Sequence, residues 1–517
     1  MDTEERALLN KNKYEYLIIP EGIIIGIIAG VIVSLYRYLL AVIFDFSVSC
    51  YSKVDSVFKA VVMFAVFIVL GAAVGLMVKR EPLISGSGIP QVEGVLLGKM
   101  RFNWLRALVL KFLGGLICLG AGMSLGREGP SVQIGAATGL GISRFRIIKG
   151  NKTRERYLLT FGAAAGLAAA FNAPFAGALF VMEELHKSFN KYVFIGGTLT
   201  GITADMVSKK VFGTSPVFTF GEVGRIPYSA MYYVIILGVA LGLIAVLFNK
   251  CIIFGANNYG KLFKIPDFLM PVPAFILTGI IALTLPQLLG GGHSLIDALP
   301  EANYGIGMLI ALLVVKFLFT EFCFASKAPG GIFLPLLTIG GLCGAVCTSI
   351  FVKYMGASPG SMSFFIAVSL AGFFGAVTKA PVTGIILVCE MTGSFSQFLF
   401  LSVVTIVSFM VTEIFGCGPI YEMILHNTLR KQKGEEEYKG KRVVVEIPVQ
   451  MTSAVVHKTV GELNLPESLL ITSINRDGEV IVPKNDVIIK SGDELVLLLY
   501  EKDLLLADEY FSKDRAQ

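Results

Sequence analysis

The sequence predicts an all-α polytopic membrane protein, built from a duplicated repeat of broken and re-entrant helices and followed by a small α/β domain. Three observations lead to this fold class. The 517 residues are 54% hydrophobic and only 16% charged, with a mean hydropathy of +0.72, whereas soluble proteins carry about a quarter charged residues. Long apolar segments recur at a fixed offset. From about residue 441 they give way to short alternating runs.

The first two apolar segments, residues 17–43 and 57–78, are each long enough to cross a bilayer as one helix, which takes about 20 apolar residues. Later segments are shorter and interrupted by Gly, Pro and polar residues, as expected of tilted and re-entrant helices that line a cavity or lie within protein. These segments are residues 83–100, 105–125, 130–148, 157–172, 174–187, 193–212, 228–255, 270–290, 306–325, 332–355, 362–378, 381–392 and 396–416.

Two stretches of the chain, about residues 60–212 and 228–416, resemble one another. The shared residues Pro174, Gly177 and Glu183 recur 207 positions later as Pro381, Gly384 and Glu390. The motif at 126–130 precedes a second glycine- and proline-bounded motif at 331–335 by 205 positions. In transporters such halves are often inverted in the membrane, with the site between them. The sequence shows the duplication, and we expect the inversion.

Basic residues indicate the orientation in the membrane. The loop at 144–156 holds six Lys or Arg against one Glu, and both tails are basic beside the membrane, at Lys11, Lys13, Arg430, Lys431 and Lys433. By the positive-inside rule all three segments face the cytoplasm; the alternative is a solvated loop without directional meaning. Residues 1–16 are charged and lack a cleavable signal pattern, so we expect a cytosolic N-terminal segment before a transmembrane domain at 17–430.

A linker at 431–440 precedes the predicted C-terminal domain at 441–517. Its alternating runs predict strands at 442–447, 469–474, 479–482, 487–490 and 494–500. Turn residues stand at 477–478 and 491–493, and a short helical piece is expected at 459–468.

The composition excludes several classes of function. The eight cysteines lie singly, and the four histidines are too scattered to form a metal site. There is no His-Glu-x-x-His run, and two Gly-x-Ser-x-Gly matches at 122–126 and 356–360 follow no hydrolase-like strand. The net charge of +6 lies in short loops and tails, which indicates topology rather than nucleic-acid binding. We therefore expect neither an enzyme nor a protein with a metal or other cofactor.

The candidate site is centred on Gly126-Arg127-Glu128-Gly129-Pro130. A charged pair at membrane depth costs about 3 kcal/mol or more per charge, so it marks a functional site. The glycines allow close backbone approach, and Pro130 suits the first turn of a new helix. A helix that restarts in mid-membrane directs free N–H groups at a small anion. Glu128 would compete with that anion, which predicts an anion transporter with Glu128 as its gate.

Two further segments, at 86–90 and 330–335, share this design of glycines that open an apolar helix. Three such helix starts would form an anion site without a full positive charge, from which the ion could leave. Ser87 adds a hydroxyl donor, and Tyr421 near the last apolar segment adds a phenol.

These motifs, in this order, resemble the CLC family of chloride channels and chloride/proton antiporters over about residues 15–430. The resemblance implies that Ser87 is the central serine, Glu128 the gating glutamate and Tyr421 the coordinating tyrosine. It also implies that the backbone amides of Ile332 and Phe333 hold the central ion. The remaining expected chloride-binding residues belong to the same motifs: Gly86, Arg127 and Gly129. The family further implies a homodimer in the lipid bilayer, with one pore in each subunit.

Glu184 decides between an antiporter and the alternative, a passive voltage- or pH-gated chloride channel. Glu183 aligns with Glu390 in the repeat and is interpreted as structural, whereas Glu184 aligns with Met391 and is unique to one half. Glu184 resembles the internal proton glutamate of the antiporters, which would pass protons toward Glu128. The structural alternative is a carboxylate that pairs with Lys187. Lys111 and Glu93 are expected to form structural charge pairs or to set the local potential.

The tail resembles the ligand-binding subdomain of potassium-transport regulators of the TrkA/RCK type, most clearly at 465–479 and 488–495. Eukaryotic members of the CLC family carry a different module there, which implies a bacterial or archaeal source and favours the bacterial inner membrane. The tail is then either a sensor of a small-molecule ligand or a module for dimerisation or stability.

Overall fold

A computed structural model describes residues 3–101, 103–144, 152–187, 189–218, 227–302, 304–433, 442–449, 453, 455–463, 465–466, 468–476, 479–500, 503 and 511. The chain divides into two compact units, Met1–Leu425 and His426–Gln517. Most of the predicted linker at 431–440 lies outside the described residues, as do residues 145–151 of the basic loop and the turn at 477–478.

Helices make up the first unit. They are α1 (Thr3–Tyr51), α2 (Val57–Arg80), α3 (Ile89–Leu96), α4 (Trp104–Gly120), α5 (Glu128–Ser143), α6 (Lys152–Phe171), α7 (Pro174–Phe180), α8 (Lys191–Phe212), α9 (Met231–Phe263), α10 (Val272–Thr284), α11 (His293–Ala298), α12 (Ile306–Ala325), α13 (Phe333–Tyr354), α14 (Met362–Thr378), α15 (Pro381–Thr392) and α16 (Phe398–Ile414); α17 (Ile420–Lys433) begins in this unit and continues into the next. Short 3₁₀ turns lie at Pro82–Ile84, Tyr228–Ala230, Asp267–Leu269, Pro286–Leu288 and Pro359–Ser361, and a π-helical turn at Val181–His186.

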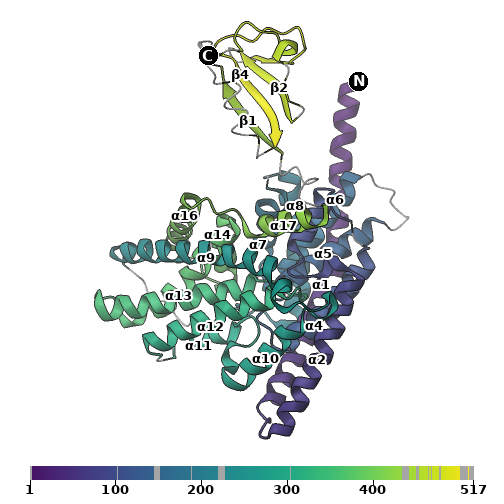
Figure 1. The fold of residues 1–517 in the computed structure, drawn as a ribbon. Coiled ribbons are helices and arrows are strands. Elements are labelled where there is room, and N and C mark those ends of the chain that lie inside the picture. The colour runs from purple at the N-terminus through teal and green to yellow at the C-terminus, as the bar shows by residue number, and fades with distance from the viewer. Residues whose placement is uncertain are drawn as a thin grey trace. The chain divides into compact units, whose positions relative to one another are not determined.

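Seven of the described helices are long and apolar enough to cross a membrane. The others are short or broken, and α9, α12 and α13 run at steep angles to α1 and α2 (Figure 1). This arrangement confirms the predicted fold class of a mostly helical membrane protein with a small C-terminal sheet. Several boundaries differ from the prediction: the first helix is longer than expected, the segment at 83–100 contains only α3 and a 3₁₀ turn, and α11 and α17 were not predicted.

Glycine-rich faces allow α5 and α6 to pack backbone against backbone. A Cβ added at Gly135 would collide with the carbonyl of Gly162, and one added at Gly166 would collide with the carbonyl of Ser131. Small residues allow such close approach where lipid supplies no hydrophobic drive for helices to associate. The glycine content of this segment therefore fixes α5, whose first residue is Glu128.

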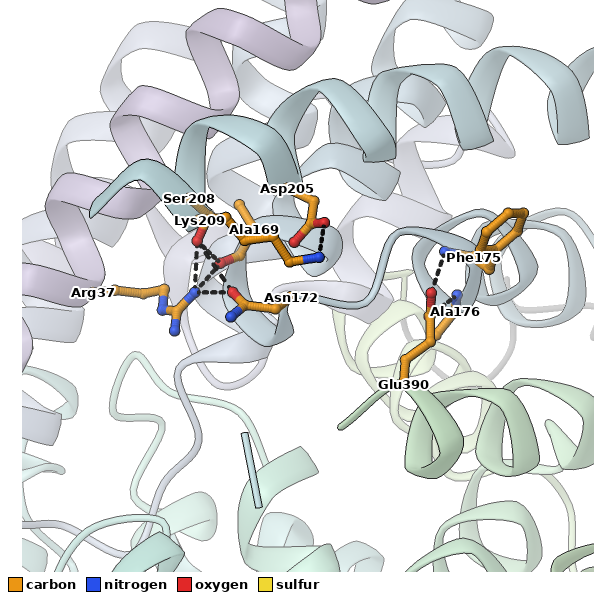
Figure 2. A network of polar contacts seen from close by, with 9 residues as sticks. All are labelled: Arg37, Ala169, Asn172, Phe175, Ala176, Asp205, Ser208, Lys209 and Glu390. Atoms are coloured by element: carbon orange, nitrogen blue, oxygen red, sulfur yellow. Dashed lines mark hydrogen bonds and ion pairs between the residues drawn. The ribbon is translucent and has the colours of Figure 1, made fainter. Parts of the chain in front are cut away.

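The two repeats exchange equivalent contacts. The Glu390 carboxylate accepts hydrogen bonds from the N–H groups of Phe175 (3.1 Å) and Ala176 (2.8 Å) at the start of α7, as Figure 2 shows. The Glu183 carboxylate accepts the equivalent bonds at the start of α15, from Val382 (3.2 Å) and Thr383 (2.8 Å). Reciprocal contacts of this kind are expected when two repeats are related by a twofold axis. They agree with the structural role predicted for Glu183.

Two buried lysines repeat the same relation. The Lys111 ammonium donates to the carbonyls of Ile84 (2.8 Å) and Gly86 (2.6 Å). Lys316, 205 positions later, donates to the carbonyls of Leu288 (2.9 Å) and Gly290 (2.7 Å). Lys111 therefore holds the loop that carries Ser87, and the structure gives it backbone carbonyls as partners rather than the carboxylate of a charge pair.

A further buried cation lies between α1, α6 and α8. The Arg37 guanidinium donates to Asn172 Oδ1 (2.9 Å) and Ser208 Oγ (2.8 Å) and to the carbonyl of Ala169 (Figure 2). Asn172 has a positive φ of 55° in the sharp connection between α6 and α7. Arg37 thus fixes the connection that leads from α6 into the helix preceding Glu184.

The second unit contains a four-stranded antiparallel sheet in the order β1-β4-β2-β3, formed by β1 (Arg442–Pro448), β2 (Leu469–Arg476), β3 (Glu479–Ile481) and β4 (Glu494–Tyr500). The predicted helical piece is a 3₁₀ turn at Val460–Leu463. The strand predicted at 487–490 is wrong: Ile488 forms only an isolated bridge to Thr459. The N–H groups of Val460 and Gly461 in the 3₁₀ turn still donate to the carbonyls of Val487 and Asn485, but these bonds do not continue the bridge as a strand ladder.

Candidate functional site

Backbone hydrogen bonds join the starts of the three predicted anion-binding helices. Gly126 and Gly331 form an antiparallel bridge, with N···O distances of 2.6 and 2.8 Å, and the N–H of Gly330 donates to the carbonyl of Gly86 at 2.9 Å. The bridge brings the start of α5 to the start of α13, and the third bond adds the loop before α3. Since the first N–H groups of a helix have no partner within it, the junction concentrates free donors from both repeats.

Glycines make this junction possible. A Cβ at Gly129 would clash with Ser87, at 2.5 Å from its Oγ and 2.6 Å from its carbonyl oxygen. A Cβ at Gly331 would lie 3.1 Å from the N atom of Gly129. Gly88 takes a φ of +97° as the residue that caps α3, in a conformation that favours glycine. The predicted residues Gly86, Ser87 and Gly129 are therefore brought together.

Glu128 is completely buried, and its carboxylate lies at this junction. A Cβ added at Gly126 would collide with Glu128 Oε2 and would lie 3.0 Å from the backbone N of Leu334. The carboxylate is therefore beside the first turn of α13. Within the described chain no side-chain donor hydrogen-bonds to either carboxylate oxygen. The backbone N–H groups of Glu128 and Leu334 face the carboxylate, and the Arg127 Nε atom forms a long ion pair with Oε1, at 3.9 Å.

Arg127 lies at the edge of a cavity of about 240 Å³. Its side chain is 21% exposed, whereas that of Glu128 is fully buried. Asp45, His293 and Leu334 also line the cavity. The buried Glu128 carboxylate therefore directly follows, in the sequence, an arginine whose side chain is partly exposed to solvent.

Ser87 and Tyr421 are buried, and the hydroxyl of each has no hydrogen-bond partner in the part of the chain that the structure describes. Buried hydroxyls are normally satisfied, so an orphaned one calls for an ion or a water molecule. Ile332 caps α13 and Phe333 is its first residue. The Phe333 ring packs between Phe171 (5.0 Å between centroids) and Phe374 (4.5 Å). These features suit a small anion held by neutral donors.

Glu184 occupies a separate place, in the π-helical turn Val181–His186. It is 2% exposed, and its Oε1 atom has no partner among the described residues. Lys187 forms its ion pairs with Glu93 (3.1 Å) and with Glu422. Because Lys187 pairs with these two residues, the alternative that Glu184 is a structural partner of Lys187 loses support.

The sequence prediction missed the partners of Lys187 and the role of Lys316. Glu93 was expected to be structural, and its ion pair with Lys187 agrees with that expectation. Glu422 adjoins Tyr421, but no local pattern marks it, because its partner lies 235 positions away. Lys316 could have been found, since it stands at the repeat offset from Lys111. Among the described residues no group of three His, Cys, Asp or Glu side chains could hold a metal ion.

Together the fold and the site define a membrane protein for small anions, in which two halves build one junction of helix starts. The chain belongs to the voltage gated chloride channel (CLC) family, whose family description matches residues 70–413. Residues 444–512 match the TrkA-C domain. The chain is thus a multi-pass membrane protein and not an enzyme.

Known relatives agree with this assignment. The chain is 33% identical over 449 residues to the "H(+)/Cl(-) exchange transporter ClcA" of Vibrio cholerae, covering 83% of this chain and 93% of the relative. It is 33% identical over 458 residues to the protein of the same name from Citrobacter koseri, covering 85% and 94%. The crystal structure of a slow cyanobacterial Cl⁻/H⁺ antiporter is similar, with a TM-score of 0.74, 28% identity, and coverage of 80% of this chain and 98% of that one.

Proposed function

We propose that this protein exchanges chloride for protons across the membrane, with Glu128 as the gate and Glu184 as the internal proton-transfer residue. The junction of helix starts around the buried Glu128 carboxylate carries the proposal. Exchange transporters in bacterial relatives and an antiporter of similar structure support the same activity.

Chloride is held by the hydroxyls of Ser87 and Tyr421 and by the backbone amides of Ile332 and Phe333, with Gly86, Arg127 and Gly129 completing the surroundings. The hydroxyl and amide donors are neutral, and Arg127 is the charged residue in the surroundings. The ion is therefore bound without a direct ammonium partner and can leave. Deprotonated Glu128 takes the outer anion position beside α13. Protonation neutralises the carboxylate, which then yields that position to chloride.

Glu184 supplies the proton from the inner side by a path separate from that of chloride. Its burial and its lack of a partner for Oε1 suit a group that must gain and lose a proton. A passive chloride channel would need no such acid. Its presence in only one repeat, opposite Met391, supports a task that the second half does not share.

The subunit arrangement and orientation extend this proposal. CLC family proteins are typically dimers, and we place the contact of a homodimer in the membrane domain, with one pore per subunit. By the positive-inside rule both termini face the cytoplasm, and the relatives favour a bacterial inner membrane. The TrkA-C domain would then serve in the cytosol, as the sensor of a small-molecule ligand or as a stabilising module.

The test uses the full chain in liposomes with a chloride gradient and no proton gradient. Wild type is expected to drive protons uphill as chloride flows. Glu184→Ala should abolish proton movement and retain chloride flux. Glu128→Ala should also retain chloride flux, which should no longer depend on protonation of the gate. Chloride flux in wild type without any proton movement would identify a passive channel and remove the role of Glu184.

A further inference from the structure

Lys187 joins three elements of the membrane unit at one point. It follows the π-helical turn Val181–His186 directly and takes a positive φ of 51°. Its ammonium contacts Glu93 of α3 at 3.1 Å between Nζ and Oε1, and it also pairs with Glu422 of α17. One cation therefore ties two helices to the turn that carries Glu184.

Each of these elements carries a residue of the proposed transport path. Helix α3 starts just after Ser87, the π-helical turn contains Glu184, and in α17 Glu422 follows Tyr421. We term Glu93, Lys187 and Glu422 the inner charge cluster. Its members are thus close in sequence to two proposed chloride ligands and to the proposed proton acceptor. A change in its charge acts on all three elements.

Exposure falls stepwise across the inner charge cluster. The side chain of Lys187 is 31% exposed, that of Glu422 15% and that of Glu93 4%, and Glu184 is 2% exposed. The cluster therefore ranges from a partly exposed cation to a carboxylate that is buried almost as deeply as Glu184. A proton that reaches Glu184 along these side chains passes through their electric field.

Four charged side chains act strongly on Glu184. Among the described residues these are Lys187, Glu93, Glu422 and Glu183. The Glu183 carboxylate is engaged by the start of α15, and the neighbouring His186 ring contacts Thr160 Oγ1 at 2.7 Å. Lys187 is the cation in this set of four, so its charge opposes that of the three carboxylates around Glu184.

Glu184 and Lys187 occur in the first repeat only. The position 207 residues after Lys187 is Ser394, just as Met391 stands at the equivalent of Glu184. Glu184 and Lys187 therefore both differ from the residues at the equivalent positions of the second repeat. Such joint departure is expected of residues that act together and are not needed to build the fold.

We propose that the inner charge cluster sets the internal pH range in which Glu184 exchanges its proton, with Lys187 as its positioning residue. The inference rests on the proposed proton transfer through Glu184. With Lys187 neutral, the carboxylates of Glu93, Glu422 and Glu184 lose the cation between them, and each holds a proton up to higher pH. With Glu422 neutral, Lys187 acts on fewer carboxylates, and Glu184 loses its proton at lower pH.

The experiment measures chloride-driven proton transport of the full chain in liposomes while the pH on the side of the termini is varied. Lys187→Gln should raise the pH of half-maximal proton transport by about one unit or more, because one charge within about 12 Å contributes about 1.4 kcal/mol or more in a medium of effective dielectric constant near 20. Glu422→Gln should lower it. Lys187→Arg keeps the charge and should keep the wild-type profile.

Lys379→Gln is the matched control. Lys379 also has a positive φ (61°) and pairs with a glutamate, Glu413, at 2.7 Å, but that pair lies in the second repeat. Its loss should leave the pH profile in place. An unchanged profile in active Lys187→Gln, or the same shift in both lysine variants, would overturn the inference. Proton transport that persists in Glu184→Ala would instead overturn the role of Glu184 itself, so the two failures are distinguishable.

Discussion

At the scale of single residues, the buried charges of the membrane unit fall into two groups. Lys111, Lys316 and Arg37 all bind backbone carbonyls and hold sharp connections in place. Glu128 and Glu184 have carboxylate oxygens that no side-chain donor reaches within the described chain. Because an unsatisfied buried carboxylate is costly, this difference agrees with the proposed function, in which the three cations build the site and the two acids exchange protons.

Glu321 of α12 is a third acid of this second kind, yet it lies away from the site. Both its carboxylate oxygens are buried and without a partner in the described structure. It lines an apolar groove with residues such as Leu277 and Ile281, and the position 205 residues earlier is Leu116. The second repeat thus keeps an acid where the first has a leucine.

Replacement of Glu321 by leucine should stabilise the protein by about 3 kcal/mol, since an acidic side chain inside a membrane helix costs roughly 2.5–3.5 kcal/mol and leucine gains a little. The readout is the thermal unfolding midpoint in detergent, with Glu321→Gln as a control of smaller gain. Proton coupling should not change. A loss of coupling in Glu321→Leu would show that this acid takes part in transport.

At the scale of elements, reciprocal capping joins the repeats. Glu183 caps α15 and Glu390 caps α7 with equivalent bonds. Since each carboxylate satisfies two N–H groups at a positive helix end, the two residues should contribute alike to stability. The adjacent Glu184 caps neither helix.

Glu183→Gln and Glu390→Gln are therefore each expected to destabilise the protein by about 1–3 kcal/mol, because a neutral amide retains only part of a charge-assisted pair of hydrogen bonds. Glu184→Gln should leave the unfolding midpoint nearly unchanged and abolish proton coupling. Thermal unfolding and liposome transport on the same three preparations decide the matter. Equal loss of stability in Glu184→Gln would make it a structural residue.

The sequence predicted this architecture unevenly, for physical reasons. Hydropathy and the repeat offset were enough for the fold class and for the pairing of Glu183 with Glu390 as structural equivalents. The Gly126–Gly331 bridge and the partners of Lys187 depend on contacts between segments some 200 positions apart, which local patterns do not encode. The strand predicted at 487–490 failed because an alternating apolar run needs a straight partner, and Val460 begins a 3₁₀ turn instead.

At the scale of the whole molecule, the transport machinery lies within one unit. Every predicted site residue from Gly86 to Tyr421 belongs to Met1–Leu425. The sheet domain has its own hydrophobic core, which includes Ile474, Leu495 and Leu497. Transport and the C-terminal domain should therefore be separable.

A chain that ends after Lys433 keeps α17 whole and lacks the sheet domain. It is expected to exchange chloride for protons with the coupling of the full chain, since no site residue is lost. Liposome flux measures the activity, and the yield of folded protein by size-exclusion chromatography measures stability. A truncated chain that folds but no longer transports would show that the C-terminal domain is needed for transport itself.

The antiparallel bridge between Gly126 and Gly331, with the reciprocal caps around it, has a consequence for the history of the chain. Two identical half-length polypeptides could form the same contacts as a twofold dimer, so the present protein has the geometry of an ancestral dimer whose subunits became fused. In such a dimer every substitution occurs twice. Glu184 and Lys187 could not stand opposite Met391 and Ser394 in a dimer of identical subunits, so a one-way division of labour between the halves requires two halves of different sequence.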